Sequence, residues 1–224
     1  MNENLPAARE TLEVEAVLLD MDGTIVDSTA VVELMWARLA DEHGLDLQEI
    51  LAYSHGRQSQ DTYAKFLPPG SDIAAACEEH ARTELTLTEG IVEIPGARVL
   101  LEALAGLPHA VVTSAPRDLA VQRIVAAGLP VPPELVTAEE VTVGKPDPEG
   151  YLLAAKRLGV DPARCLVLED ADAGLQAGIA SGATTVVVGE HRSEATETLT
   201  RVHDFTSVRA RPAAGDGIEV TFGQ

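Results

Sequence analysis

The sequence predicts an α/β protein with a parallel sheet at its core and an all-helical insertion after the first strand. Two observations support the sheet. Short apolar, β-branched runs alternate with amphipathic helical patterns along most of the 224 residues, and several of these patterns end at glycine, as helices often do. A third observation supports the insertion: from Ala30 to about Glu89 the chain shows helical patterns and no convincing strand.

The strands are predicted from short runs rich in Val, Leu and Ala. The first run, Val14–Leu19, leads directly into Asp20. Later strands are predicted at Ala110–Thr113, Leu135–Val136, Leu166–Leu168 and Thr184–Val188. Helices are predicted near Ala97–Ala105, Asp118–Ala127, Pro148–Leu158 and Ala171–Ser181. This alternation is typical of βαβ units, so we expect a Rossmann-like parallel sheet.

The insertion is expected to form a cap over residues 29–89, with residues 1–28 and 90–224 as the core. The run VVELMWARLADEHG is amphipathic and ends at Gly44, and DIAAACEEHARTEL reads as another helix. Hinges are expected near Asp27–Thr29 and within EGIVEIPG, which glycine and proline interrupt. At the other end of the chain, VRARPAAGDGIEVTFGQ can form a hairpin across AAGDG.

Composition narrows the possible partners. The formal net charge is −20, which disfavours binding to nucleic acid or to an anionic membrane surface. The first 16 residues show no signal-peptide pattern, and no apolar run approaches the ~20 residues of a membrane span. Cys77 and Cys165 are far apart and outside any CxxC pair, so neither a disulfide scaffold nor a zinc site is expected. We expect a cytoplasmic protein, as a monomer or weak dimer.

Polar residues follow each predicted strand, where an open α/β sheet binds ligands. The first strand ends in DMDGT, which places two carboxylates one residue apart before a turn glycine. Because like charges this close repel and lose water on burial, a divalent cation is expected to compensate them. One edge of the sheet then carries the following groups: Asp20, Asp22, Thr24, Thr113, Ser114, Lys145, Glu169 and Asp170.

In the order DMDGT, TSA, GKPDP and EDADAG, these segments resemble the motifs of the haloacid dehalogenase superfamily, and the resemblance covers nearly the whole chain, from Val14 to about Val188. The chain looks most like the sugar-phosphate phosphatases of that superfamily. The resemblance implies that Asp20 is a nucleophile attacking phosphorus and that Asp22 is the general acid and base. It also implies Mg²⁺ held by Asp20, the Asp22 carbonyl and Asp170, with Glu169 as a further ligand, direct or through water.

The same resemblance assigns the phosphate contacts. Thr113 and Ser114 would hydrogen-bond phosphoryl oxygens, and Lys145 would neutralise charge on the phosphoryl group and on Asp20. Gly23 would permit the sharp turn after the nucleophile, with the amides of Gly23 and Thr24 near the phosphate. The expected partner is therefore a small phosphorylated sugar or polyol.

Members of this superfamily catalyse several reactions, so the fold does not fix the function. Dehalogenases of the superfamily lack an aspartate at the position of Asp22. A phosphonatase would need a cap lysine. The only lysine of the cap, Lys65, is expected to be a solvated helix residue. The beta-phosphoglucomutase type carries a histidine on its first cap helix, where this chain has Val32. Phosphatase is thus favoured, with a phosphomutase and a non-catalytic, metabolite-binding relic as alternatives.

Substrate selection is expected from the cap loop. The run YSHGRQSQD resembles the cap loop of hexose and sugar-alcohol phosphatases, so His55 and Arg57 are candidate substrate contacts. The other histidines, such as His43, His80 and His191, are expected at the surface or at helix ends.

Overall fold

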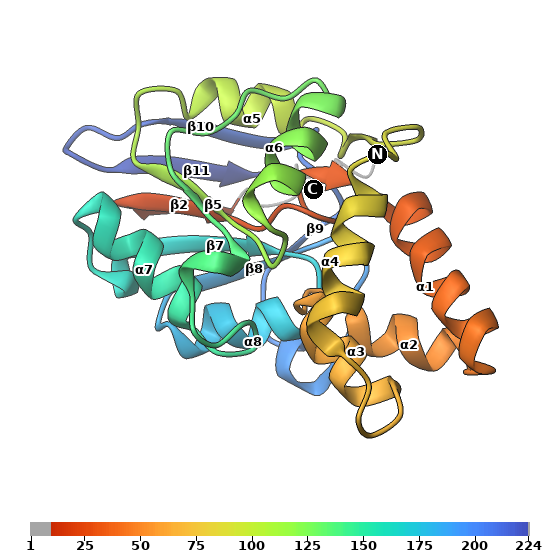
Figure 1. The fold of residues 1–224 in the computed structure, drawn as a ribbon. Coiled ribbons are helices and arrows are strands. Elements are labelled where there is room, and N and C mark those ends of the chain that lie inside the picture. Colours follow the sequence, from red (N-terminus) through yellow and green to blue (C-terminus); the bar gives the residue numbers. More distant parts are fainter. Residues whose placement is uncertain (1–9, 224) are drawn as a thin grey trace, which may run out of the picture.

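The computed structural model describes residues 10–223, and it is built around one parallel sheet (Figure 1). The segment in which no signal peptide was found therefore lies mostly outside the described residues. The sheet has six strands in the order β6-β5-β2-β7-β8-β9, and every neighbouring pair is parallel. Its strands are β2 (Ala16–Leu19), β5 (His109–Val112), β6 (Leu135–Val136), β7 (Cys165–Glu169), β8 (Thr184–Val188) and β9 (Arg201–Val202).

Helices cover both faces of this sheet, which confirms the predicted fold class. In Figure 1, α5 and α6 lie above the sheet, and α7 and α8 lie below it. Alternate residues of β2 point to opposite sides, so Val17 packs in the cluster of α5 and α6, and Leu18 packs in the cluster of α7 and α8. These helices are α5 (Ala97–Ala103), α6 (Arg117–Ala126), α7 (Glu149–Leu158) and α8 (Asp172–Ala180).

The first predicted strand differs from the structure. It divides at Glu15 into β1 (Glu10–Val14) and β2, and β1 leaves the parallel sheet. β1 pairs antiparallel with β11 (Ile218–Phe222), which also pairs with β10 (Val208–Pro212). The predicted C-terminal hairpin is therefore confirmed, and its inward side chains join the main hydrophobic core.

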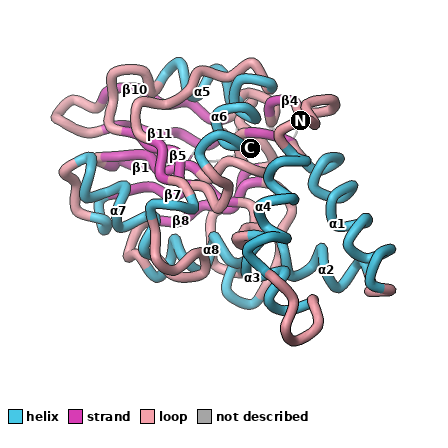
Figure 2. Tube along the Cα trace, viewed as in Figure 1, coloured by secondary structure: helices cyan, strands magenta, loops and turns pink. Residues whose placement is uncertain are grey.

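The segment from α1 to α4 is entirely helical apart from its connections (Figure 2). The helix α1 ends at Gly44, whose φ of 64° lies in the left-handed region that glycine favours. A separate hydrophobic cluster, which includes Trp36, Ile50 and Tyr63, holds the helices together. The four helices are α1 (Thr29–His43), α2 (Leu47–Ser54), α3 (Ser59–Phe66) and α4 (Ile73–Glu84).

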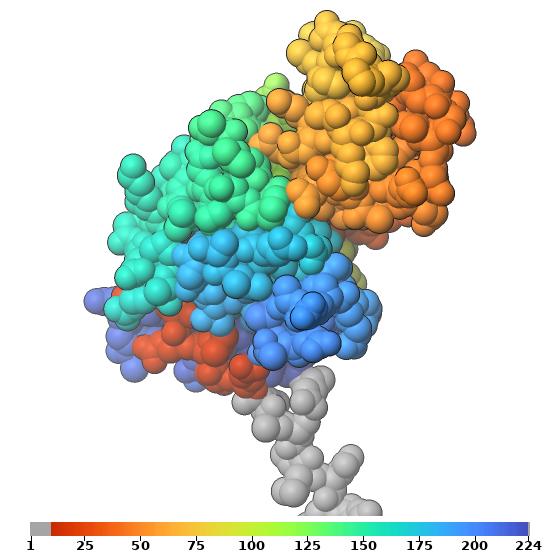
Figure 3. Space-filling view, turned by 90° about the horizontal axis from the view of Figure 1, so that it is seen from below, coloured from red at the N-terminus to blue at the C-terminus, as the bar shows by residue number. Residues whose placement is uncertain are grey.

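The chain enters and leaves these helices at neighbouring points. The short strand β3 (Val26–Asp27) pairs antiparallel with β4 (Val92–Glu93), so the two segments expected as hinges lie side by side. In the space-filling view, α1–α4 form a lobe at one end of the molecule (Figure 3). None of the helices between residues 10 and 223 is long and apolar enough to cross a membrane.

Candidate active site

The turn after β2 places the two aspartates of DMDGT. The amides of Thr24, Ile25 and Val26 all donate to the carbonyl of Met21, which folds the chain back beyond the strand. Gly23 makes this turn with a φ of 83°, and a Cβ at this position would lie 2.1 Å from Asp170 Oδ2. A side chain there would therefore collide with the acidic cluster.

The amides of Gly23 and Thr24, which were expected near a phosphate, have hydrogen-bond acceptors within this turn. The amide of Gly23 donates to the Val26 carbonyl over 2.8 Å, and that of Thr24 donates to the Met21 carbonyl over 3.2 Å. Both N–H groups therefore donate within the turn. The Thr24 side chain is buried and donates to Asp170 Oδ1 over 3.1 Å, so it orients a carboxylate.

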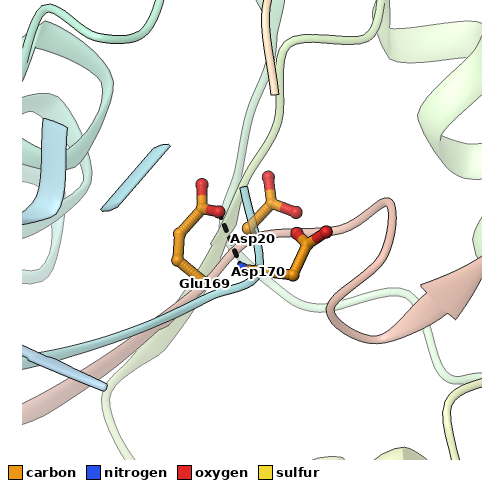
Figure 4. A group of neighbouring side chains, drawn as sticks. All are labelled: Asp20, Glu169 and Asp170. Atoms are coloured by element: carbon orange, nitrogen blue, oxygen red, sulfur yellow. Dashed lines mark hydrogen bonds between the residues drawn. The ribbon is translucent and has the colours of Figure 1, made fainter. Parts of the chain in front are cut away.

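Three carboxylates meet at the carboxyl ends of β2 and β7 (Figure 4). Asp20, Glu169 and Asp170 each offer an oxygen within 4.8 Å of the others. The two strands are direct neighbours, and Leu19 pairs with Leu168, so the next residues along each strand are brought together. The sequence-predicted acidic pair and the predicted ED motif thus share one site.

Lys145 supplies positive charge to this cluster. Its Nζ donates to Asp20 Oδ1 over 2.5 Å, to Glu169 Oε1 over 2.7 Å and to the Val112 carbonyl over 3.1 Å. Burial alone would lower the pKa of Lys145, but the two carboxylates raise it above its ordinary value. The lysine therefore stays charged although it is 5% exposed.

Glu169 is fully buried and has hydrogen-bond partners on both oxygens. Oε1 accepts from Lys145 and from the Tyr151 hydroxyl, and Oε2 accepts from the amides of Asp170 and Ala171. Gly174 leaves the space that this carboxylate needs, since a Cβ there would lie 1.5 Å from Oε1. These contacts make Glu169 an anchor for Lys145 and for the loop after β7.

Asp20 and Asp170 are the carboxylates that a cation would fit. Burial and the neighbouring Glu169 raise the pKa of Asp20 to about 7, although Lys145 acts in the opposite direction. Burial and the charges of Glu169 and Asp20 raise the pKa of Asp170 well above its ordinary value. A Mg²⁺ ion, which prefers carboxylate and carbonyl oxygens, would stabilise both ionised forms.

Asp22 lies beside this cluster and is held by two partners. Ser28 Oγ donates to its Oδ1 over 2.6 Å, and Arg123 Nη1 donates to its Oδ2 over 2.8 Å. Ser28 is the last residue before α1, and Arg123 projects from α6. The second aspartate is thus oriented separately from the first, as different roles would require.

The end of β5 contributes the two predicted hydroxyls. Thr113 and Ser114 both line a cavity that also contains Asp20 and Asp22. Thr113 Oγ1 accepts from the Ala115 amide, which fixes its orientation. Ser114 Oγ donates over 2.8 Å to the carbonyl of Gly56, so this phosphate-binding candidate also contacts the α2–α3 loop.

The two cap-loop candidates, His55 and Arg57, line the same cavity. Burial lowers the pKa of His55, which favours a neutral ring. The Arg57 guanidinium lies 4.7 Å from the centre of the Tyr53 ring, a cation–π geometry that holds it at the cavity wall. Both side chains therefore lie in the wall of the cavity that also contains Asp20.

The cavity wall includes residues that sequence reasoning missed or misplaced. Arg123 and Glu84 were not singled out, and His80 was expected at the surface, but all three are buried and line the cavity. A sequence signal existed for each. Arg123 lies on the apolar stripe of its helix beside Leu119, and His80 and Glu84 continue the inward stripe of α4 at helical spacing.

Comparison with known proteins supports the same family. A family model described as haloacid dehalogenase-like hydrolase matches residues 14–182. Hexitol phosphatase A of Escherichia coli (strain K12) is 44% identical over 181 residues, which are 79% of this chain and 84% of that protein.

A second relative aligns over more of the chain. Glycerol-1-phosphate phosphohydrolase 2 of Saccharomyces cerevisiae is 32% identical over 229 residues, covering 95% of this chain and 92% of that protein. Among solved structures, beta-phosphoglucomutase from Clostridium difficile has a TM-score of 0.76 over 88% of this chain and 93% of that chain; at 22% identity this likeness shows the fold alone. The motifs, the fold and the matched model agree: this chain belongs to the haloacid dehalogenase-like hydrolase family.

Proposed function

We propose that this protein is a Mg²⁺-dependent phosphatase of small sugar or polyol phosphates, acting through an aspartyl-phosphate on Asp20. The observation that carries the proposal is the placement of Asp20. It is buried beside Lys145 and Asp170 and opens, together with Asp22, into a cavity beneath the α1–α4 helices. The relatives named above are phosphatases of a hexitol phosphate and of glycerol 1-phosphate, which supports this substrate class.

The first half of the reaction transfers the phosphoryl group. The Asp20 carboxylate attacks phosphorus while the ester P–O bond breaks, and protonated Asp22 gives its proton to the departing oxygen. Ser114, Thr113 and Lys145 would bind the phosphoryl oxygens. Asp22 leaves this step as a carboxylate, and the hydrogen bond from Arg123 stabilises that form.

The second half regenerates the enzyme. The Asp22 carboxylate takes a proton from water, and the water oxygen attacks phosphorus, which releases inorganic phosphate and restores Asp20. The carboxylates of Asp20 and Asp170 and the carbonyl of Asp22 would hold Mg²⁺, which supplies positive charge that lets an anionic nucleophile meet a phosphate. Because its oxygens are already bonded, Glu169 would act mainly by orienting Lys145, with contact to the metal through water.

A cap lobe at the site supports a reaction that must exclude water and later admit it. We propose residues 29–89 as this cap, residues 1–28 and 90–224 as the core, and the cytoplasm as the place of action of a monomer or weak dimer. The phosphomutase alternative lacks support at one position: Val32, where the mutase carries histidine, lines the cavity and cannot transfer a proton.

The test is release of inorganic phosphate from a panel of sugar, polyol, glycerol and nucleotide phosphates, with Mg²⁺ and with EDTA. We expect release from sugar or polyol phosphates that needs Mg²⁺ and is lost in Asp20→Asn. Asp41→Asn, an exposed change on α1, is the matched control and should retain activity. Absence of release by a folded, Mg²⁺-binding protein would reject the phosphatase and lead to tests of sugar 1-phosphate isomerisation, then of simple binding.

A further inference from the structure

Two side chains, Ser28 and Arg123, hold the carboxyl group of Asp22. Ser28, the residue before α1, donates from Oγ to Asp22 Oδ1 over 2.6 Å. Arg123 on α6 donates from Nη1 to Asp22 Oδ2 over 2.8 Å. Because the two bonds engage different oxygens, they fix the plane of the carboxyl group. Each oxygen keeps a further lone pair, which can carry the proton that Asp22 is proposed to transfer.

Arg123 is in turn held by Glu84, the last residue of α4. Its Nη2 donates to Glu84 Oε1 over 2.5 Å. Arg123 is 4% exposed and Glu84 is 6% exposed, so water and salt screen the pair little. Among residues 10–223, this is the only ion pair that joins α1–α4 to the rest of the chain. Because a guanidinium presents its donors in a rigid fork, a shift of Glu84 would turn Arg123 and disturb its bond to Asp22.

Glu84 is itself held from within the helical segment. Its Oε2 lies 3.3 Å from His80 Nε2, and His80 Nδ1 lies 2.8 Å from the Tyr63 hydroxyl. The Trp36 ring packs against the His80 ring, with 4.7 Å between the ring centres. Burial would raise the pKa of Glu84, but His80 and Arg123 lower it below its ordinary value, so the carboxylate is charged. The position of Glu84 is therefore tied to α1, α3 and α4 together.

This series of contacts from α4 reaches the general acid and bypasses the nucleophile. Arg123 and Glu84 line the cavity that also contains Asp20 and Asp22. In the part of the chain that the structure describes, neither Arg123 nor Glu84 forms a hydrogen bond or ion pair with Asp20 or Lys145. A change at Arg123 or Glu84 should therefore disturb the second aspartate and leave the first one with its cation.

We propose that Arg123 is a positioning residue for Asp22, and that Glu84 makes this positioning depend on the docking of α1–α4 against the core. The proposal deepens the proposed function and rests on it. With the helices docked as in this structure, Glu84 holds Arg123, and Arg123 holds Asp22 in the orientation for proton transfer. When the helices move away, Arg123 loses one of its two anchors. Proton transfer is then efficient only while the site is covered.

The experiment compares two small phosphates that differ in their need for a proton. Glycerol must be protonated as it leaves glycerol 1-phosphate, whereas acetyl phosphate releases acetate, a stable anion that needs no proton. Both reactions use Asp20, Lys145 and the proposed Mg²⁺. Because kcat/KM refers to the transition state of phosphoryl transfer relative to free enzyme and substrate, the ratio of the two values measures proton donation by Asp22. Both rates are measured on the same sample, so partial unfolding of a variant leaves the ratio unchanged.

We expect Arg123→Lys to lower kcat/KM for glycerol 1-phosphate about tenfold more than for acetyl phosphate. Proton donation contributes about 10²–10⁴-fold, and lysine lacks the planar fork that bridges the two carboxylates. Glu84→Gln should shift the ratio several-fold in the same direction, acting through Arg123. Asp22→Asn is the reference and should shift the ratio most. Glu78→Gln and Val125→Ala, exposed changes on α4 and α6, should keep the ratio.

The outcomes separate this proposal from the phosphatase proposal. If Arg123→Lys lowers kcat/KM equally for both compounds, Arg123 is only structural and the positioning role is rejected. If Glu84→Gln leaves the ratio unchanged, the dependence on the docked helices is rejected. If Asp22→Asn lowers both values equally, or the unmodified enzyme releases phosphate from no member of the panel, the proposed phosphatase mechanism itself fails.

Discussion

At the scale of single residues, the site is a set of buried charges that compensate one another in pairs. Lys145 forms ion pairs with Asp20 and Glu169, and Arg123 forms ion pairs with Asp22 and Glu84. Among residues 10–223, the Thr24 hydroxyl is the only side-chain hydrogen-bond partner of the Asp170 carboxylate, so this carboxylate, together with Asp20, could hold a cation. Each pair costs desolvation energy, so removing one partner should be far more harmful than exchanging an exposed charge.

Lys145→Met tests this at the acidic cluster. The change leaves Asp20 and Glu169 buried without their cation, and we expect a loss of about 3 kcal/mol in the free energy of unfolding in EDTA. Mg²⁺ should recover more stability in this variant than in the unmodified protein, because it becomes the main remaining countercharge. Urea unfolding with and without Mg²⁺ measures both effects. The control is Lys156→Met at an exposed position of α7; equal Mg²⁺ effects in all three proteins would contradict the expectation.

Gly174→Ala tests the packing of Glu169. In an ordinary helix this change stabilises by up to ~1 kcal/mol. Here the added Cβ would lie 1.5 Å from Glu169 Oε1, so the buried carboxylate must move away from Lys145. We expect a loss of about 2 kcal/mol in thermal or urea unfolding, as for other overpacked sites. Gly215→Ala, where a Cβ meets nothing within 4 Å, serves as the control. Similar stability of the two variants would show that the Glu169 side chain can move aside at little cost in free energy.

Site residues could be predicted where short sequence motifs contain them. Asp20, Asp22, Lys145 and Asp170 follow directly after strands or stand in short motifs, and the parallel sheet brings such positions together. Arg123 was missed because its carboxylate partners are remote: the pair with Asp22 spans 101 positions of the chain. Only its place on an apolar helical stripe indicated that it is buried.

At the scale of elements, the predicted helices and parallel strands agree with the structure to within a few residues at their ends. The error at Val14–Leu19 has a physical cause. A continuous apolar run predicts one strand, but Val14 pairs antiparallel with Ile218, 204 positions later in the chain. A local sequence pattern does not indicate which distant strand a residue pairs with. No helix was predicted at the short η1 (Ala138–Glu140), which lies between β6 and α7.

Glu140 joins several elements and predicts a pH effect. Its carboxylate accepts from Thr137 at the start of η1, from Arg117 on α6 and from Arg157 on α7. Burial would raise its pKa, but the hydrogen bonds from Arg157 and Thr137 lower it to about 2, from an ordinary 4.5. Because the folded-state pKa is the lower one, this stabilisation is present above pH 4.5 and is lost as the pH falls to about 2.

Glu140→Gln should therefore lower the free energy of unfolding by about 1 kcal/mol at neutral pH, since the site is partly exposed. The difference from the unmodified protein should shrink between pH 4.5 and 2. Urea unfolding at pH 6 and pH 3 makes the comparison. A difference that stays constant across this range would show that the carboxylate charge contributes nothing.

At the scale of the whole molecule, a formal charge of −20 surrounds a site that must bind an anion. At the site, Lys145, the two arginines that line the cavity and the proposed Mg²⁺ supply the positive charge that an anion needs. Elsewhere the acidic side chains repel one another and oppose the compact state. The net charge can be counted from the sequence. That the positively charged side chains gather at the site follows only from the three-dimensional arrangement.

Salt should therefore stabilise the protein. Raising the salt concentration from about 0.01 M to about 0.15 M shortens the Debye length from about 30 Å to about 8 Å, which weakens repulsion between distant acidic groups. We expect Tm to rise by a few degrees. Choline chloride at the same ionic strength is the control, because this large cation does not fit a carboxylate cluster. If only MgCl₂ raises Tm, cation binding and not general screening is the cause.

The pairing of β1 with β11 has a consequence for how the protein is made. The strand Glu10–Val14 leaves the ribosome before its hydrogen-bonding partner, Ile218–Phe222, exists, because Ile218 follows Val14 by 204 positions. At about 5–20 residues per second, roughly ten seconds or more separate the two events. During that interval the parallel sheet and its helices can assemble, while the edge of β1 has no partner. The antiparallel sheet can therefore close only after Ile218–Phe222 has been synthesised, and chaperones that shield unpaired strand edges would act on Glu10–Val14 in the meantime.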